Sequence, residues 1–373
     1  AQAADGHVYL SPNPALQLPM RIVPREHPER WVKEVTVELS QAFDLRHELP
    51  FRCVLLRGQE VSDVLFVCPH ALSDGFSVTY LIRDFLGFLN NPDVDVTPMP
   101  LARPMSELIP DFSGKRAAIW RAKLKAGLLK IFLRCSPKQA QSDRVNSVQP
   151  KYHLIPWVLT EEQTSALVAR SRAEGTTVHA ALCVAFLRAF GELRAGGWKR
   201  RIQSPISLRE RLARPVGESF GLFVNLVEFQ VDCAPEHGFW EVARKIKQGF
   251  IRRTTDRKIF NSLIEANAVT HRLGKVITPQ IAAQTLMSAD HDLSITNLGR
   301  LDLPTRYGSL QLEALFGPIL GGDPEDGVLG VLTIGGRMHL GLSFTDLKMD
   351  AAQATQIIAT AMRWLAKAAE WQV

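Results

Sequence analysis

The segment FVCPHALSDGFSV, residues 66–78, places a histidine and an aspartate at a predicted bend. His70 ends a hydrophobic run, and Asp74 and Gly75 follow before apolar residues resume. A histidine between a buried strand and a turn lies where loops hold reactive groups on a rigid scaffold, and neutral imidazole can act as a general base near neutral pH. A plain turn histidine is the alternative. Metal binding is disfavoured, because the turn separates the two side chains and no second cluster of ligand residues is evident.

The elements around His70 form a predicted strand-turn-helix unit. Residues 50–58 and 62–70 are rich in apolar residues and predict two paired strands. Apolar residues recur near helical period from Phe76 to Leu89 and predict a helix that ends at the NNPD sequence, residues 90–93. Upstream of this unit we expect short strands and turns, including half of a hairpin at residues 5–10.

A proline-rich loop and a basic helix follow the unit. Residues 91–112 hold five prolines and predict a loop. Residues 114–134 predict a helix with Trp120, Leu124 and Leu128, together with Ile131, on one face, and basic side chains on the other. We expect this apolar face to pack on the core, with contact to an anionic membrane as the alternative. The polar residues 136–152 predict a linker.

The second half mixes strands and helices. The predicted strands include residues 151–159, 218–232 and 292–303, and residues 201–212 predict a strand that runs into a charged turn. A final hairpin is predicted about Gly335 and Gly336. The predicted helices follow a Thr160 capping box, a TTVHAAL sequence at residues 176–182, a basic sequence at residues 240–255 and an Asp350 cap. The chain is therefore expected to be α/β, with two-layer sandwiches in two domains, residues 1–135 and 153–373.

Composition limits the class of protein. The 373 residues contain no apolar run of 18 or more, and the N-terminal sequence lacks a basic-then-apolar signal peptide, so the cytoplasm is the expected location. Five widely spaced cysteines favour free thiols over disulfides or zinc. The net charge of +6 comes from residues 112–141, which hold eight basic and no acidic residues and leave 6 − 8 = −2 elsewhere. Such local basicity with sparse aromatics disfavours nucleic acid as a partner.

Several sequences, taken in order, resemble the chloramphenicol-acetyltransferase-like superfamily. His70 to Gly75 match its HxxxDG motif, TTVHAALCVAFLRAF resembles the helix that opens its second half, and SPISLRERL resembles its strand ending in a Leu-Arg pair. The GESFGLFVNL sequence resembles the segment after that strand. ITNLGRLDL resembles the SNLG segment of the alcohol acetyltransferase and polyketide-associated branch, close to condensation domains. The resemblance implies two similar domains with an active-site channel between them.

The chain departs from the family pattern in two places. Pro69 replaces the first histidine of the HHxxxDG version, but the second histidine is the catalytic one in the family. The usual opening strand and first helix of the family have no recognised counterpart before the motif. Their absence would leave hydrophobic surface uncovered, so we expect another element to replace them.

The resemblance also assigns roles. His70 would be the general base that deprotonates an acceptor hydroxyl or amine as it attacks an acyl thioester. Asp74 would pair with an arginine, for which Arg209 is the candidate; a helix N-cap and a surface charge are the alternatives. Gly75 would allow close approach to the channel wall or be an ordinary turn glycine. Thr296, Asn297 or Ser294 would stabilise the oxyanion, or be plain strand residues.

The implied reaction needs no permanently bound cofactor and no metal. The donor would be acyl-CoA or an acyl chain on the phosphopantetheine of an acyl carrier protein, and a basic surface suits either. The acceptor would be a small-molecule alcohol, with an amide-forming condensation enzyme as the alternative and a non-catalytic carrier-protein docking module as a third. We expect a monomer. Dihydrolipoyl acyltransferase cores carry a similar motif near their C-terminus, whereas about 300 residues follow His70 here.

Overall fold

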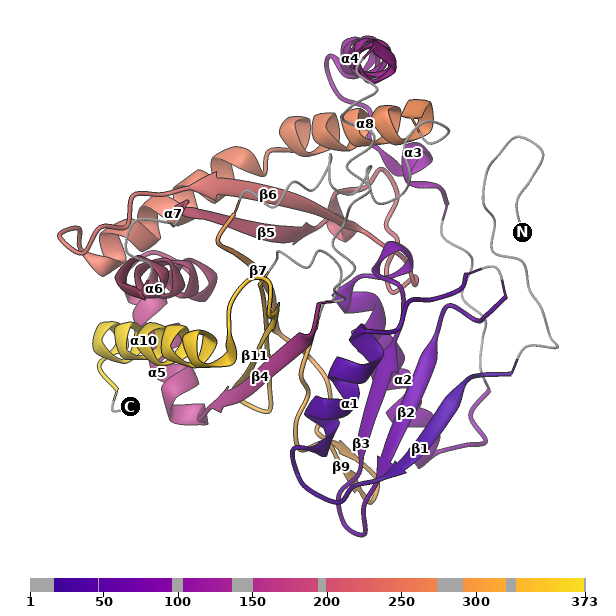
Figure 1. Cartoon of the computed structure of the whole chain (residues 1–373), viewed down its shortest axis with the longest axis vertical. Coiled ribbons are helices and arrows are strands. Elements are labelled where there is room, and N and C mark those ends of the chain that lie inside the picture. Colours follow the sequence, from indigo (N-terminus) through magenta and orange to yellow (C-terminus); the bar gives the residue numbers. More distant parts are fainter. Residues whose placement is uncertain are drawn as a thin grey trace.

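The structure is a computed structural model that describes residues 17–45, 47–95, 103–135, 150–193, 199–273, 291–319 and 327–371, except for the side chains of 129–135 and 269–273. Its strands form two main sheets that belong to the two halves of the chain (Figure 1). This mixed architecture is the α/β class that the sequence predicts. The predicted hairpin at residues 5–10 and most of the predicted linker lie outside the described residues.

The first sheet has the order β1-β2-β3. Its strands are β1 (Met20–Pro24), β2 (Arg52–Arg57) and β3 (Asp63–Val67), and the β2–β3 pair is antiparallel, as predicted. β1 runs parallel to β2 and forms an edge of the sheet. Met20 and Ile22 on β1 remain more than half exposed, so apolar surface is uncovered in this half. α2 (Gly75–Asn90) follows β3 and ends at the predicted NNPD sequence, with Asn91 as its C-cap.

Helix α1 (Arg30–Leu39) corrects the expectation of only strands and turns in this region. Its sequence RWVKEVTVEL contains four β-branched residues, which lower intrinsic helix propensity. Ion pairs of its acidic residues with arginines from the strands and from its own first turn stabilise the helix. Arg21 on β1 contacts Glu34 at 2.6 Å and Glu38 at 3.0 Å, and Arg30 contacts Glu34 at 2.9 Å. Tertiary contacts therefore override local propensity here.

The second sheet has the order β4-β11-β10-β7-β5-β6. Its strands are β4 (Tyr152–Leu159), β5 (Arg201–Ser207), β6 (Val224–Gln230), β7 (Leu293–Arg300), β10 (Val328–Ile334) and β11 (Arg337–Thr345). The β10–β11 hairpin turns at Gly335 and Gly336, whose φ angles of +55° and +80° favour glycine. A separate small pair consists of β8 (Arg306–Tyr307) and β9 (Leu310–Gln311).

Helices cover the second sheet, and two of them begin with the predicted caps. They are α5 (Glu161–Ala173), α6 (Val178–Leu193), α7 (Phe239–Arg253), α8 (Asp256–Leu273) and α10 (Ala351–Ala369). Thr160 and Asp350 each form a full capping box with the residue three positions on. α6 is almost entirely buried, as its apolar sequence predicts. α8 is a helix that the sequence interpretation did not identify.

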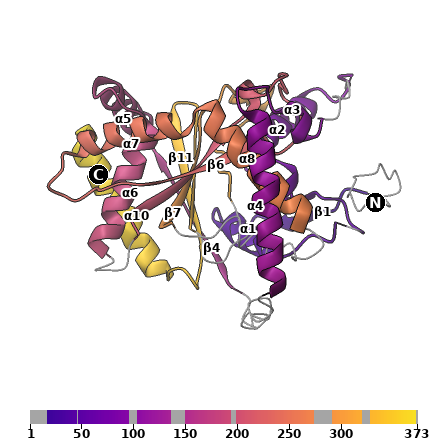
Figure 2. The same cartoon turned by 90° about the horizontal axis from the view of Figure 1, so that it is seen from above.

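The connection between the halves contains two further helices. α3 (Met105–Leu108) is a short helix in the proline-rich segment that was predicted as a loop, and residues 96–102 of that segment lie outside the described part. α4 (Lys115–Cys135) matches the predicted basic helix and packs along α8 at the edge of the molecule (Figure 2). The buried face of α4 is not the predicted one: Ala118, Ala122 and Ala126 are buried, whereas Trp120, Leu124 and Leu128 are exposed.

No single described helix is long and apolar enough to cross a membrane. Helices α5 and α6 together would be long and apolar enough by length and composition alone, but they are bent by 102° relative to each other.

Candidate active site

His70 lies on a one-turn 3₁₀ helix, His70–Leu72, between β3 and α2. Its side chain is exposed, and its Nδ1 atom lies 2.9 Å from the backbone carbonyl oxygen of Ser73. Since a carbonyl oxygen can only accept a hydrogen bond, Nδ1 carries the proton of the neutral ring. Nε2 then keeps its lone pair for a proton from another molecule. The loop therefore fixes both the orientation and the tautomer of His70.

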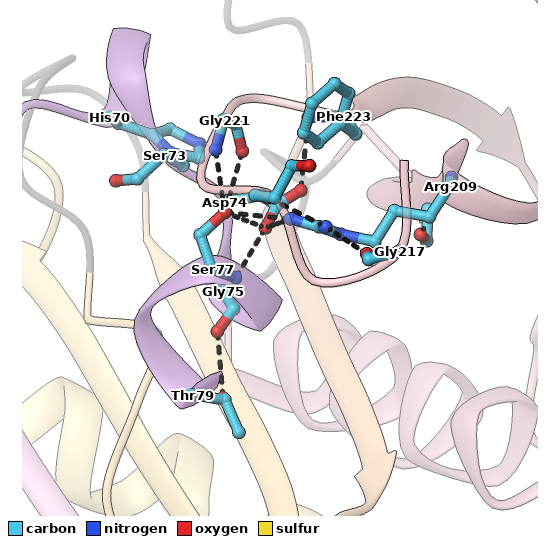
Figure 3. A network of polar contacts seen from close by, with 12 residues as sticks. His70, Ser73, Asp74, Gly75, Ser77, Thr79, Arg209, Gly217, Gly221 and Phe223 are labelled. Carbon is cyan, nitrogen blue, oxygen red and sulfur yellow. Dashed lines mark hydrogen bonds and ion pairs between the residues drawn. The ribbon is translucent and has the colours of Figure 1, made fainter. Parts of the chain in front are cut away.

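Asp74 faces away from His70 and is the N-cap of α2 (Figure 3). The residue is 2% exposed. Its Oδ1 atom accepts hydrogen bonds from the Ser77 amide at 2.8 Å and from Arg209 Nη2 at 2.8 Å, and its Oδ2 atom accepts from the Phe223 amide at 3.1 Å. These donors satisfy a buried carboxylate that would otherwise be costly. Asp74 is thus held as part of the scaffold, and both the predicted ion pair with Arg209 and the N-cap are present.

Arg209 follows β5 and connects the two halves through one guanidinium group. Its Nη1 atom donates to the carbonyl oxygens of Gly217 at 2.8 Å and Ser219 at 3.0 Å. The group also lies 4.8 Å from the ring centre of Phe223 and 5.6 Å from that of Tyr80. The planar fork of arginine suits this arrangement, because one group reaches a carboxylate and two carbonyls at once.

The loop of residues 217–223 is fastened to the start of α2. Ser77 Oγ accepts hydrogen bonds from the Gly221 amide at 3.0 Å and from Arg209 Nη2 at 2.8 Å. The Asp74 amide donates to the Gly221 carbonyl oxygen at 3.1 Å. We call this set, formed by Asp74, Ser77, Arg209 and the loop 217–223, the interdomain clamp. It holds a loop of the second half directly behind the His70 motif.

A second, more exposed ion pair borders the interdomain clamp. Arg83 on α2 donates to both carboxylate oxygens of Glu218, each at 2.6 Å, and also contacts Asp84. The hydrogen bonds with Glu218 raise the pKa of Arg83, and those with Arg83 lower the pKa of Glu218. The two charged side chains therefore favour each other's ionised form.

Gly75 lies against the second half at the first turn of α2. A Cβ atom at this position would lie 2.7 Å from Pro318 Cγ and 2.9 Å from Leu298 Cδ2. Such distances are shorter than van der Waals contact, so a side chain cannot be added without movement. The close approach predicted for Gly75 is present, and its neighbours are Leu298, next to Asn297, and Pro318.

The three predicted oxyanion residues lie on β7 and differ in their surroundings. Ser294 is 7% exposed, and its Oγ atom lies 3.5 Å from Gln203, as in a plain strand residue. Thr296 is 6% exposed and its hydroxyl forms no side-chain hydrogen bond with the other described residues. Asn297 Oδ1 accepts from the Gly299 amide at 2.7 Å, which leaves its amide group available. The structure gives no direct contact of these residues with His70.

Cys68 lies two residues before His70 but is not suited to be a nucleophile. Its Sγ atom lies 2.9 Å from Ser73 Oγ, and burial raises the pKa of its thiol. A protonated thiol is a poor nucleophile. Among the described residues, no group of three or more His, Cys, Asp or Glu side chains could hold a metal ion.

A cavity of about 760 Å³ lies between α1 and β4, lined by residues of both halves. His70 and the residues of the interdomain clamp do not line it. The cavity is therefore separate from the candidate catalytic group, and the channel implied for His70 stays a prediction.

Several residues of the site were not predicted from the sequence. Ser77 lies three positions after the N-cap aspartate, where a side chain often takes part in capping, so a cap rule could have indicated it. Gly221, Phe223 and the Arg83–Glu218 pair act over more than 130 positions, and nothing in the local sequence indicates those contacts.

Comparisons with known proteins give one sequence-family match and many matches of fold. Residues 150–319, less than half of the chain, match the sequence model of the phthiocerol/phthiodiolone dimycocerosyl transferase C-terminus. A search of curated proteins finds no match. Solved structures match across almost the whole chain at low identity, so these matches establish the fold alone.

Three of these structures illustrate the kinds of protein that share the fold. The epimerization domain from the third module of tyrocidine synthetase B has a TM-score of 0.58 at 15% identity, covering 95% of this chain and 80% of that one. The EpoB NRPS cyclization-docking bidomain from Sorangium cellulosum has a TM-score of 0.62 at 14% identity, with 96% and 72% covered. Polyketide synthase associated protein 5 from Mycobacterium tuberculosis has a TM-score of 0.58 at 13% identity, with 99% and 86% covered.

The fold, the family match and the ordered sequence motifs agree with one another. The described part has the two-domain architecture of condensation domains, and its second half carries the sequence pattern of an acyltransferase family. Residues 150–319 are thus similar to an acyltransferase family, and the chain has the fold of condensation domains and of polyketide synthase associated protein 5.

Proposed function

We propose that the protein is an acyltransferase that moves an acyl group from a CoA or carrier-protein thioester to an acceptor hydroxyl, with His70 as the general base. The observation that supports this most directly is the hydrogen bond of His70 Nδ1 to the Ser73 carbonyl oxygen. It presents Nε2 as a proton acceptor on an exposed side chain. The match of residues 150–319 to an acyltransferase family supports the class of reaction.

The proposed reaction proceeds by direct transfer. Nε2 of His70 takes the hydroxyl proton as the acceptor oxygen attacks the thioester carbonyl carbon. The new carbon–oxygen bond gives a tetrahedral intermediate with a negatively charged oxygen. When that intermediate collapses, the carbon–sulfur bond breaks and Nε2 returns the proton to the thiolate. The products are an ester and a free thiol, and no acyl group is held on the protein.

The remaining residues would position His70 or stabilise the oxyanion. Asp74 and Arg209 do not touch the reacting atoms; they hold the loop that aims His70. Thr296 and Asn297 are the proposed donors to the oxyanion, since their side chains keep unused hydrogen-bonding groups and Leu298 beside them packs on Gly75. Loss of such a donor costs about 10² to 10³ in rate in known enzymes.

The test is a substrate panel with two readouts. The chain is incubated with acyl-CoAs and acyl carrier proteins of varied acyl length, together with small alcohols and amines, and free thiol and product mass are measured. Ester formation with thiol release supports the proposal. An amide product would identify a condensation enzyme instead. Absence of thiol release from every donor, in protein that still binds a carrier protein, would favour the docking alternative.

A further inference from the structure

The outer face of α4 carries a continuous row of large apolar side chains. Trp120, Leu124 and Leu128 are 66%, 50% and 60% exposed. Residues four apart lie one above the other on a helix, so these three form one ridge. Exposed apolar residues are unremarkable when scattered singly, but a contiguous row of them indicates an interaction site. We call these three residues the α4 ridge.

The opposite face of α4 explains why the ridge is exposed. Ala118, Ala122 and Ala126 are each at most 5% exposed, and this face packs along α8. Small side chains allow the two helices to approach closely. The packing of α4 on the protein therefore uses its small residues and leaves the side chains of the α4 ridge at least half exposed.

Positive charge lies on both sides of the α4 ridge. Helical spacing places Arg116 and Lys123 along one side and Arg121 and Lys125 along the other. Of these four, Lys125 forms an ion pair with Glu265 on α8, at 2.8 Å. No acidic residue occurs between residues 112 and 141. An apolar ridge between two rows of cations is the pattern of a helix that lies in the headgroup region of an anionic membrane.

We propose that α4 binds the surface of an anionic lipid bilayer, with the α4 ridge inserted and the flanking cations at the phosphate level. Both views place α4 at the outside of the molecule, next to α8 (Figures 1 and 2). Trp120 fits this position, since an indole has an apolar body and one polar N–H group. A second copy of the chain fits less well, because two facing ridges would bring their cations together. This inference does not depend on the proposed function.

The first test is flotation of the full chain with lipid vesicles. Vesicles of equal parts phosphatidylglycerol and phosphatidylcholine are compared with vesicles of phosphatidylcholine alone. We expect binding to the first kind at least tenfold stronger than to the second, since about fivefold in affinity is gained for each cation near an anionic surface. A charge-reversed Arg121→Glu/Lys123→Glu variant should lose about tenfold or more in binding to the anionic vesicles.

The second test removes the ridge. The Trp120→Ser/Leu124→Ser/Leu128→Ser variant should lose at least about tenfold in vesicle binding, because three apolar side chains no longer insert. Its matched control is Ile251→Ser/Leu347→Ser, which removes two side chains of 58% and 57% exposure elsewhere and should bind as the natural chain does. Thermal melting of all variants verifies that they are folded.

Two results would overturn the proposal. One is that the natural chain binds neither kind of vesicle. The α4 ridge would then contact an acidic protein or another segment of its own chain instead of a membrane. A purified acidic acyl carrier protein, bound by the natural chain and lost by the triple serine variant, would then identify a protein partner. The other is a triple serine variant that binds anionic vesicles as well as the natural chain does.

Discussion

His70 and Asp74 are four residues apart and have opposite surroundings. His70 is exposed, and its side chain has one described hydrogen bond, to a backbone carbonyl. Asp74 is buried, and donors from both halves of the chain surround it. The contrast shows how one short motif separates a group that must meet other molecules from a group that fixes the backbone. Changes at the first should alter rate with little effect on folding, and changes at the second should alter folding.

The largest effect is expected for His70→Ala on turnover. Loss of the general base should lower kcat by about 10² to 10⁴. The free energy of unfolding should change by no more than about 1 kcal/mol, since a single hydrogen bond is lost. The matched control is His47→Ala, another exposed histidine with one hydrogen-bond partner, Asp44. Turnover that survives in the His70 variant would remove this residue from the chemistry.

Removal of the buried charge should have the opposite profile. Arg209→Met keeps most of the side-chain volume but leaves Asp74 buried without its ion-pair partner, which should cost about 3–5 kcal/mol in the free energy of unfolding. Urea denaturation measures this loss. The double variant with Asp74→Asn should lose less than the sum of the single losses, because the two side chains interact directly. Additive losses would show that the pair contributes no coupling.

A smaller effect is expected for Gly75→Ala. The added methyl group would clash with Pro318 and Leu298, and such overpacking costs about 1–3 kcal/mol. Gly87→Ala is the control on the same helix, because nothing lies within 4 Å of its added Cβ atom. That control should gain about 0.5–1 kcal/mol from helix propensity. Equal changes in melting temperature at both positions would contradict the close approach at Gly75.

Features that depend on local sequence could be predicted, whereas features that depend on contacts between distant parts of the chain could not. His70, Asp74, Arg209 and Gly75 were identified because the HxxxDG and Leu-Arg sequences resemble a family, and helix caps were identified because capping depends on neighbouring residues. α1 was missed, since its β-branched sequence has low helix propensity and the ion pairs of its acidic residues with Arg21 on β1 join separate segments of the chain. The contacts of Gly221 and Phe223 with the motif join distant parts of the chain, so local sequence patterns cannot predict them.

Helix α4 shows the limit of amphipathic patterns. The sequence correctly predicted the helix and the grouping of Trp120 with its apolar neighbours, but the prediction that this face packs on the core was wrong. Periodicity identifies faces that differ in character without stating which one the protein covers. Here the alanine face is covered because it permits close contact with α8, a helix that was itself not predicted.

The smallest effect is expected at the exposed border of the interdomain clamp. Glu218→Gln removes the ion pair with Arg83. The Arg83 and Glu218 side chains are 31% and 43% exposed, so the loss in the free energy of unfolding should be only about 0.2–1 kcal/mol at pH 7. The folded-state pKa of Glu218 is lowered by Arg83, so this stability is complete above the unfolded pKa of about 4.3 and is lost as the pH falls through the folded pKa.

The measurement is the difference in free energy of unfolding between the natural chain and Glu218→Gln, taken from pH 7 to pH 3. The difference should shrink once the pH falls below about 4, because the natural carboxylate becomes protonated. Glu60→Gln, an exposed position without a described ion pair, should give no such trend. A difference at Glu218 that stays constant over this range would mean that the pair acts by shape and hydrogen bonding alone. The clamp would then depend on charge only at its buried centre, between Asp74 and Arg209.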